Sequence, residues 1–130
     1  DYCKNNDITF YSYMVLEQGA LSGKYDSAHP FPSGSDRATA YNPILPKLDA
    51  LLNKMREIGV FHSSSVAQIA TAWAIAKGTL PIIGVTKAEQ VEEAVKTINI
   101  FLTEREIREL ESLADKAKVS TIRGWEKEMK

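Results

Sequence analysis

The apolar positions along this chain fall into two continuous runs and several periodic stretches. Ile8–Leu16 is rich in β-branched and aromatic residues and lies between a polar N-terminal segment and Gly19. Leu80–Val85 is a second unbroken apolar run, too short for a helix. Continuous apolar runs of this length are typical of strands that are buried on both faces. The pattern therefore predicts two buried strands.

Two helices are predicted between these strands. Asn42-Pro43 offers an N-cap and a first-turn proline, and Gly59 marks the end of the first helix. Its apolar face recurs every three or four residues and comprises Ile44, Leu45, Leu48, Leu51, Leu52, Met55 and Ile58. The second helix begins at Ser65, whose spacing to Gln68 fits a capping box, and ends at Gly78.

Two further helices are predicted after the second strand. Thr86–Glu89 fits a second capping box, and Thr103–Glu106 fits a third. The inward positions of these two helices are expected to be Val91, Ala94, Val95 and Ile98, and then Ile107, Leu110, Leu113 and Ala114. The charged tail from Lys118 to Lys130 carries Ile122 and Trp125, which are expected to anchor it onto a neighbour.

The polar segment Asp26–Asn42 is predicted to be one long loop, of the kind that serves as a binding loop, a lid or a disordered segment. The predicted order is strand, loop, two helices, strand, helix and helix, which implies a parallel pair of strands in an α/β arrangement. Two strands are buried on both faces only if further strands lie beside them. We therefore expect this chain to be a piece of a larger domain.

Composition narrows the classes of function. The 130 residues are 44% hydrophobic and 25% charged, with a net charge of −1, so the chain has no electrostatic preference for nucleic acid or an anionic membrane. No apolar run approaches the roughly 18 residues of a membrane span, and the N-terminal residues do not form a signal peptide. Cys3 is the single cysteine, so neither a disulfide nor a metal site is expected, and a cytoplasmic location is the default.

The segment PIIGVTKAEQVEEA, residues 81–94, combines an apolar run, a glycine and the start of a helix. Such a helix N-terminus can hold a phosphate, because its free amide groups and the helix dipole attract anions. The same segment is also an ordinary connection between a strand and a helix. The residues alone favour Thr86 as a plain N-cap, and they leave both interpretations open.

Four segments in order resemble the aldo-keto reductase family: YSYMVLEQGALSGKY, SSVAQIATAWAIAKG, PIIGVTKAEQVEEA and LTEREIRELESL. The family has a (β/α)₈ barrel, uses NADP(H) or NAD(H), and reduces aldehydes and ketones. The resemblance implies that residues 1–130 are the C-terminal fragment of a single barrel domain. They would supply the last two parallel strands with their helices, together with a C-terminal helical extension.

The resemblance also implies which residues hold the cofactor, because phosphate sites of such barrels lie in the loops after the last two strands. Tyr13 would stack under the nicotinamide, while Lys24 would lie near the phosphates. The backbone of the loop after the first strand would contribute through Leu16, Glu17 and Gly19. The adenosine phosphate end would be held by Gly84, Thr86, Lys87, Gln90 and Glu93. Three positions depart from the family pattern, since Met14 and Val15 replace Ser-Pro and Ala94 replaces Asn.

The catalytic residues of the family are a tetrad of Asp, Tyr, Lys and His, and no segment of this chain matches any of them. The chain alone is therefore predicted to reduce no carbonyl, and Tyr13 is assigned a binding role. His29 and His62 are expected to be surface residues. Three hypotheses remain open: part of an NADP-dependent reductase, a non-catalytic nucleotide-binding or regulatory module of the same fold, and a structural fragment that associates with itself.

Overall fold

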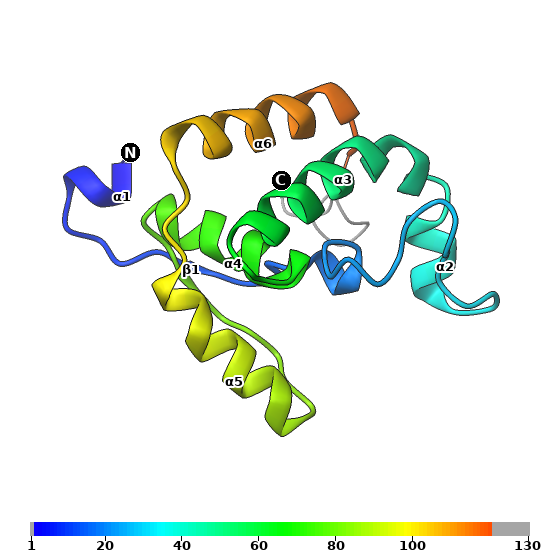
Figure 1. The fold of residues 1–130 in the computed structure, drawn as a ribbon, viewed down its shortest axis with the longest axis horizontal. Coiled ribbons are helices and arrows are strands. Elements are labelled where there is room, and N and C mark those ends of the chain that lie inside the picture. The colour runs from blue at the N-terminus through cyan, green and yellow to red at the C-terminus, as the bar shows by residue number, and fades with distance from the viewer. Residues whose placement is uncertain (1, 121–130) are drawn as a thin grey trace, which may run out of the picture.

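The computed structural model describes residues 2–120, which form a helical body beside one short pair of strands (Figure 1). The elements in chain order are α1 (Tyr2–Asn5), β1 (Tyr11–Ser12), the 3₁₀ turn η1 (Glu17–Gly19), α2 (Asp36–Tyr41), α3 (Leu45–Phe61), α4 (Val66–Ala76), β2 (Leu80–Pro81), α5 (Ala88–Lys96), η2 (Thr97–Asn99) and α6 (Glu104–Ala117). The predicted anchors Ile122 and Trp125 lie outside the described residues.

The two strands pair in parallel, as the sequence predicts, with Tyr11 opposite Leu80 and Ser12 opposite Pro81. The prediction that they are long and buried is wrong. Each strand has only two residues, and the Tyr11 and Leu80 side chains are 61% and 52% exposed. A parallel strand is buried only when other elements cover both of its faces. Residues 2–120 do not cover both faces of either strand.

The core lies between α3, α4 and α6. Leu45, Leu52 and Ile69 are completely buried, and Leu110 of α6 packs against the same cluster. Figure 1 shows α6 lying along α3, whereas α5 projects from the opposite side of the helical body. The stripe predicted for α3 is buried from Leu45 to Ile58, whereas the stripes predicted for α4 and α6 are buried only in part, since Ile75 and Ala114 are exposed.

The capping boxes of α4 and α6 are confirmed. The Ser65 and Thr103 side chains each accept a hydrogen bond from the third helical amide, and the Gln68 and Glu106 side chains accept from the amides of Ser65 and Thr103. The start predicted for α3 is wrong, since the helix begins at Leu45. Asn42 is instead the residue that ends α2, and its side chain bonds both the amide and the carbonyl of Phe31 in the preceding segment.

The segment 26–42 is not one continuous loop, because it contains the short helix α2, capped by the Ser35 hydroxyl. The end predicted for α3 at Gly59 is also two residues early, as the helix runs to Phe61. Gly59 is nevertheless required sterically, because a Cβ there would lie 2.5 Å from the carbonyl oxygen of Ser64. The glycine thus allows the chain to fold back closely onto the end of α3.

The inward face predicted for α5 is wrong as well. The described side chains of α5 include none that is buried, and Val91, Val95 and Ile98 are largely exposed. Ala94 is half-buried, and the buried residue of this region is Thr97, in the η2 turn that follows. The helix α5 therefore rests on the body through a few specific contacts.

Candidate functional site

One pocket brings together residues from both strand ends, and we call it the β2–α5 pocket. Because β1 and β2 are parallel, the segments that follow them leave from the same end of the pair. The pocket has a volume of about 330 Å³, and four predicted cofactor residues line it: Leu16, Gly84, Gln90 and Glu93. The sequence-based prediction thus names residues that lie together in space even though Leu16 and Gly84 are far apart in the chain.

The N-terminus of α5 is closed by the side chain of Gln90. Its Oε1 atom accepts hydrogen bonds from the amide of Thr86 (2.8 Å), from the amide of Lys87 (3.1 Å) and from the Thr86 hydroxyl (3.3 Å). The N-cap position is Lys87, so the predicted capping box from Thr86 to Glu89 is wrong. The Gln90 side-chain oxygen accepts from the Thr86 amide, the role that the predicted box gave to Glu89, and the Thr86 hydroxyl is itself a donor to Gln90.

The wall that α4 contributes to the β2–α5 pocket is polar and buried. Gln68 and Thr71 lie on the same face of α4, three residues apart, and both line the pocket together with Thr97 from η2. The Thr71 and Thr97 hydroxyls donate to the carbonyls of Ala67 and Glu93, each at 2.9 Å. This wall was not predicted from the sequence. Its signal was two polar side chains, three residues apart, within an otherwise apolar helix.

The predicted residues of the first loop lie in or beside the η1 turn. Glu17 and Gly19 have φ angles of 45° and 105°, values that are uncommon for residues other than glycine and that make the turn tight. The Tyr41 hydroxyl donates to the Glu17 carboxylate at 2.8 Å, and so fixes the turn against α2. Lys24 is exposed, with its ammonium 5.3 Å from the centre of the Tyr25 ring.

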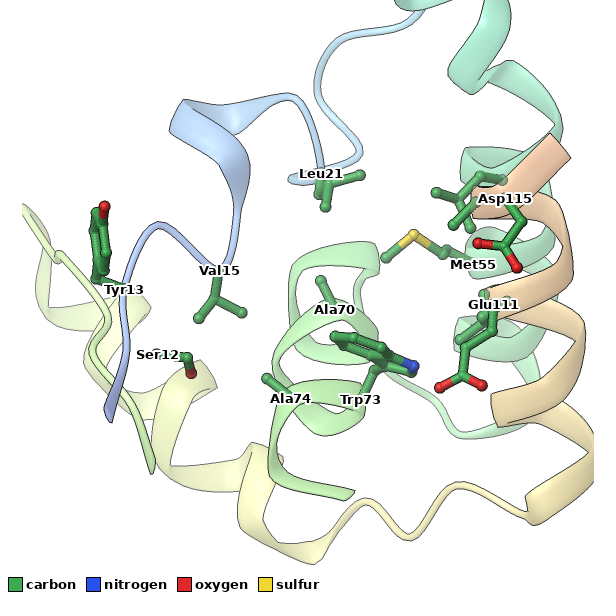
Figure 2. A pocket seen from close by; sticks show the side chains of 13 residues that line it. Ser12, Tyr13, Val15, Leu21, Met55, Ala70, Trp73, Ala74, Glu111 and Asp115 are labelled. Carbon is green, nitrogen blue, oxygen red and sulfur yellow. The ribbon is translucent and has the colours of Figure 1, made fainter. Parts of the chain in front are cut away.

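Tyr13 lies at a second pocket, the α4–α6 pocket, of about 450 Å³ (Figure 2). Figure 2 shows Tyr13 and Val15 on one side of this space, with Trp73 of α4 and Glu111 of α6 on the other. The lining is mainly apolar. The structure therefore places Tyr13 apart from the four predicted residues that share the β2–α5 pocket.

The remaining ionisable residues mostly secure the helices. His62 was expected at the surface, yet its side chain is only 16% exposed and its Nε2 atom lies 2.9 Å from the Glu106 carboxylate. Burial raises the pKa of Glu106, but hydrogen bonds from Thr103 and His62 outweigh burial and bring that pKa below its usual value. Across residues 2–120, no group of three or more His, Cys, Asp or Glu side chains could hold a metal ion.

The helices were also compared with the length and composition of a membrane span. Among residues 2–120, no helix combines the length and the apolar composition that crossing a bilayer requires. The 17 residues of α3 carry several charged side chains, and the more apolar α4 has only 11 residues.

Known proteins resemble this chain in sequence and in fold. Pyridoxal reductase from Arabidopsis thaliana chloroplasts is 35% identical over 122 residues, which are 94% of this chain and 33% of the relative. An aldo-keto reductase of Schizosaccharomyces pombe, named with NADP(+), is 30% identical over 90% of the chain and 36% of its own length. An L-glyceraldehyde 3-phosphate reductase of Escherichia coli is 33% identical over 76% of the chain and 31% of its own length.

The chain spans about a third of the length of these relatives. A glycerol dehydrogenase from Gluconobacter oxydans superposes with a TM-score of 0.74 over 95% of this chain and 39% of its own, at 21% identity. That likeness shows the fold, which is part of an aldo-keto reductase barrel. The parallel pairing of β1 and β2 agrees with this fold. The model of the aldo/keto reductase family matches residues 1–115, and the chain therefore belongs to this family.

Proposed function

We propose that this chain is the C-terminal, cofactor-binding portion of an NADP(H)-dependent aldo-keto reductase, which reduces aldehydes or ketones by hydride transfer. One observation carries the proposal. The segment after β1 and the segment after β2 together line the β2–α5 pocket, and they do so through Leu16, Gly84, Gln90 and Glu93. Ligand sites of (β/α)₈ barrels lie at the carboxyl ends of the strands, where these segments begin.

The chemistry of the pocket fits the adenosine phosphate end of a nicotinamide dinucleotide. Beside the pocket, two backbone amides and one hydroxyl converge on the Gln90 Oε1 atom at the N-terminus of α5, and a phosphate that displaced this oxygen would accept from the same donors. The exposed Lys87 side chain adds a positive charge beside them. A volume of about 330 Å³ is at the small end of ligand pockets, which suits part of a dinucleotide.

Each predicted residue then has a role in binding. Thr86 and Lys87 would hold the phosphate, Gln90 would face the 2′-phosphate, and Glu93 would accept a hydrogen bond from the adenine amine. The backbone around Glu17 and Gly19 would lie along the pyrophosphate with Lys24 nearby. When bound, the nicotinamide supplies the hydride that adds to the carbonyl carbon.

The name of the Schizosaccharomyces pombe relative supports NADP(H) over NAD(H), which remains the alternative cofactor. Tyr13 would form a stacking surface for the nicotinamide, and the proton for the carbonyl oxygen would come from residues outside this chain. We expect residues 1–130 by themselves to reduce no carbonyl, because no segment matches the catalytic tetrad.

The test uses the full-length protein that contains this chain. We expect it to bind NADPH in a fluorescence titration and to oxidise NADPH with members of a broad aldehyde panel. NADPH binding without oxidation, together with a tetrad that is missing upstream, would favour the regulatory module instead. Absence of both binding and oxidation would contradict the proposal.

A second candidate is self-association of the chain, and the exposed strands favour it. Ile82 and Val85 follow β2 and are exposed, as is Tyr11 of β1, so apolar surface accompanies unpaired strand edges. Such edges tend to pair with another chain. Size-exclusion chromatography of residues 1–130 tests this candidate, and a monodisperse monomer would contradict it.

A further inference from the structure

The structure connects α4 to α5 through one buried side chain, that of Gln68. Gln68 is buried, with a residue exposure of 9%. Its Nε2 atom donates to the carbonyl oxygen of Glu93 in the middle of α5, at 2.9 Å. Its Oε1 atom accepts from the Ser65 amide at 3.0 Å and so completes the capping box of α4. One amide thus caps one helix and holds another.

This connection matters because α5 has few other attachments. Its described side chains include none that is buried, and Val91 and Val95 on its apolar side are largely exposed. The adjacent turn is fixed by Thr97, which is 1% exposed and donates to the same Glu93 carbonyl at 2.9 Å. The Glu93 carbonyl is therefore the point at which the polar contacts of α4 and η2 meet.

We infer that Gln68 is a positioning residue for the cofactor site: by holding the Glu93 carbonyl it orients the pocket face of α5 toward the bound nucleotide. This inference rests on the proposed function. Gln90 and Glu93 lie one helical turn apart on the face that lines the β2–α5 pocket. A rotation or lift of α5 would move both side chains together. Gln68 acts through the backbone of α5, so it sets the orientation of these groups.

Loss of the connection has a defined consequence for binding. A helix that samples several orientations presents the binding-competent one for only part of the time, and the apparent dissociation constant rises in inverse proportion to that fraction. One hydrogen bond is worth about a threefold to tenfold change in such an equilibrium. We therefore expect weaker cofactor binding with unchanged chemistry once the cofactor is bound.

The Gln68→Glu substitution separates the two roles of the side chain. A carboxylate still accepts from the Ser65 amide and preserves the cap, but it has no hydrogen to donate to the Glu93 carbonyl. In the full-length protein, we expect the Kd and KM for NADPH to rise by about threefold to tenfold, with kcat at saturating NADPH unchanged. Hydrogen exchange should show faster exchange in α5 and unchanged exchange in α6.

Protonation shows whether the effect of Gln68→Glu depends on the charge state of the introduced side chain. Because burial raises the pKa of a carboxyl group, lowering the pH should protonate the introduced side chain and restore a donor to the Glu93 carbonyl. The ratio of variant to wild-type Kd should therefore fall as the pH is lowered. Gln68→Met removes both hydrogen bonds without burying a charge, and it serves if Gln68→Glu folds poorly.

Thr103→Ala is the matched control, because it removes the cap of α6 and leaves the β2–α5 pocket intact. Equal losses of NADPH affinity in Thr103→Ala and the Gln68 variants would overturn the inference, as would wild-type affinity and α5 exchange in Gln68→Glu. A wild-type protein that binds no NADPH would overturn the proposed function and the cofactor role of Gln68 with it. Binding by the wild type and equal binding by Gln68→Glu would overturn only the role of Gln68.

Discussion

The Gln90→Glu substitution should change the stability of α5 and the affinity for NADPH in opposite directions. Gln90 occupies the third position of α5, where its Oε1 atom accepts from the amides of Thr86 and Lys87. A carboxylate keeps these bonds and adds a negative charge at the positive end of the helix dipole, which stabilises the helix by about 0.3 to 1 kcal/mol. The same charge would repel a phosphate bound at this terminus.

The size of the repulsion follows from the charge separation. Two unit charges about 5 Å apart interact by about 3 kcal/mol at an effective dielectric constant of 20, and by about 1 kcal/mol in bulk water. Gln90 is exposed, so the value for water sets the lower limit. We therefore expect NADPH affinity to fall by about 4-fold to 200-fold. NADH, which lacks the 2′-phosphate, should lose less.

The assay is a fluorescence titration of the full-length protein with NADPH and with NADH, at low and at high salt. Salt should reduce the difference between variant and wild type, because it screens exposed charges. Asn99→Asp is the matched control, since it adds the same charge at an exposed position in η2. The reasoning would be refuted if Gln90→Glu bound NADPH as tightly as Asn99→Asp, or if NADH lost as much affinity as NADPH.

Two further predictions concern stability, measured by urea unfolding of the full-length protein. Gly59→Ala should destabilise by about 2 kcal/mol, because overpacking against the Ser64 backbone carbonyl costs up to about 3 kcal/mol and helix propensity returns about 1 kcal/mol; a variant as stable as wild type would contradict this. Glu106 has a lowered pKa in the folded protein, so its contribution is present above the ordinary value of 4.5 and is lost as the pH falls through the folded value. Glu106→Gln should therefore show a weaker decline of stability below pH 4.5, and an unchanged decline would count against the hydrogen bonds from His62 and Thr103.

Local rules predicted the helices well where one turn of chain contains all the partners. The capping boxes at Ser65 and Thr103 are confirmed because the cap and its third helical residue determine each other. At Thr86 the same rule was wrong, since Gln90 and not Glu89 accepts from the Thr86 amide, and the N-cap is Lys87. A capping motif with two eligible acceptors does not fix the first residue of a helix.

Burial could not be predicted in the same way, because it depends on residues that are distant in the chain. The apolar runs at Tyr11 and Leu80 predicted buried strands, but residues 2–120 do not cover them. The helix α2 was missed for a related reason. Its position depends on Tyr41, which is buried and whose hydroxyl bonds Glu17 from a segment more than 20 residues away. Neither the exposure of the strands nor the bond between Tyr41 and Glu17 can be predicted from a window of a few residues.

The candidate site combines both kinds of information. The resemblance of two separate segments predicted Leu16, Gly84, Gln90 and Glu93, and these residues do line one pocket. The buried wall that supports them could not be predicted, because Gln68 fits its capping box equally well with or without a bond to α5. The motif accounts for the oxygen of the Gln68 side chain, and the partner of its nitrogen lies 25 residues away in the chain.

The arrangement of these contacts separates the stability of the body from the geometry of the pocket. The core of α3, α4 and α6 is apolar, whereas α5 receives a polar connection from α4, the hydrogen bond from Gln68 to the Glu93 carbonyl, next to the buried Thr97. Hydrogen bonds are directional, so a few of them can fix the rotation of a helix more sharply than an apolar stripe can. Under the proposed function, a cofactor released in every cycle would need a site that is well oriented and only lightly held. The polar attachment of α5 meets both requirements, because it specifies the direction of Gln90 and Glu93 while it buries little of the helix.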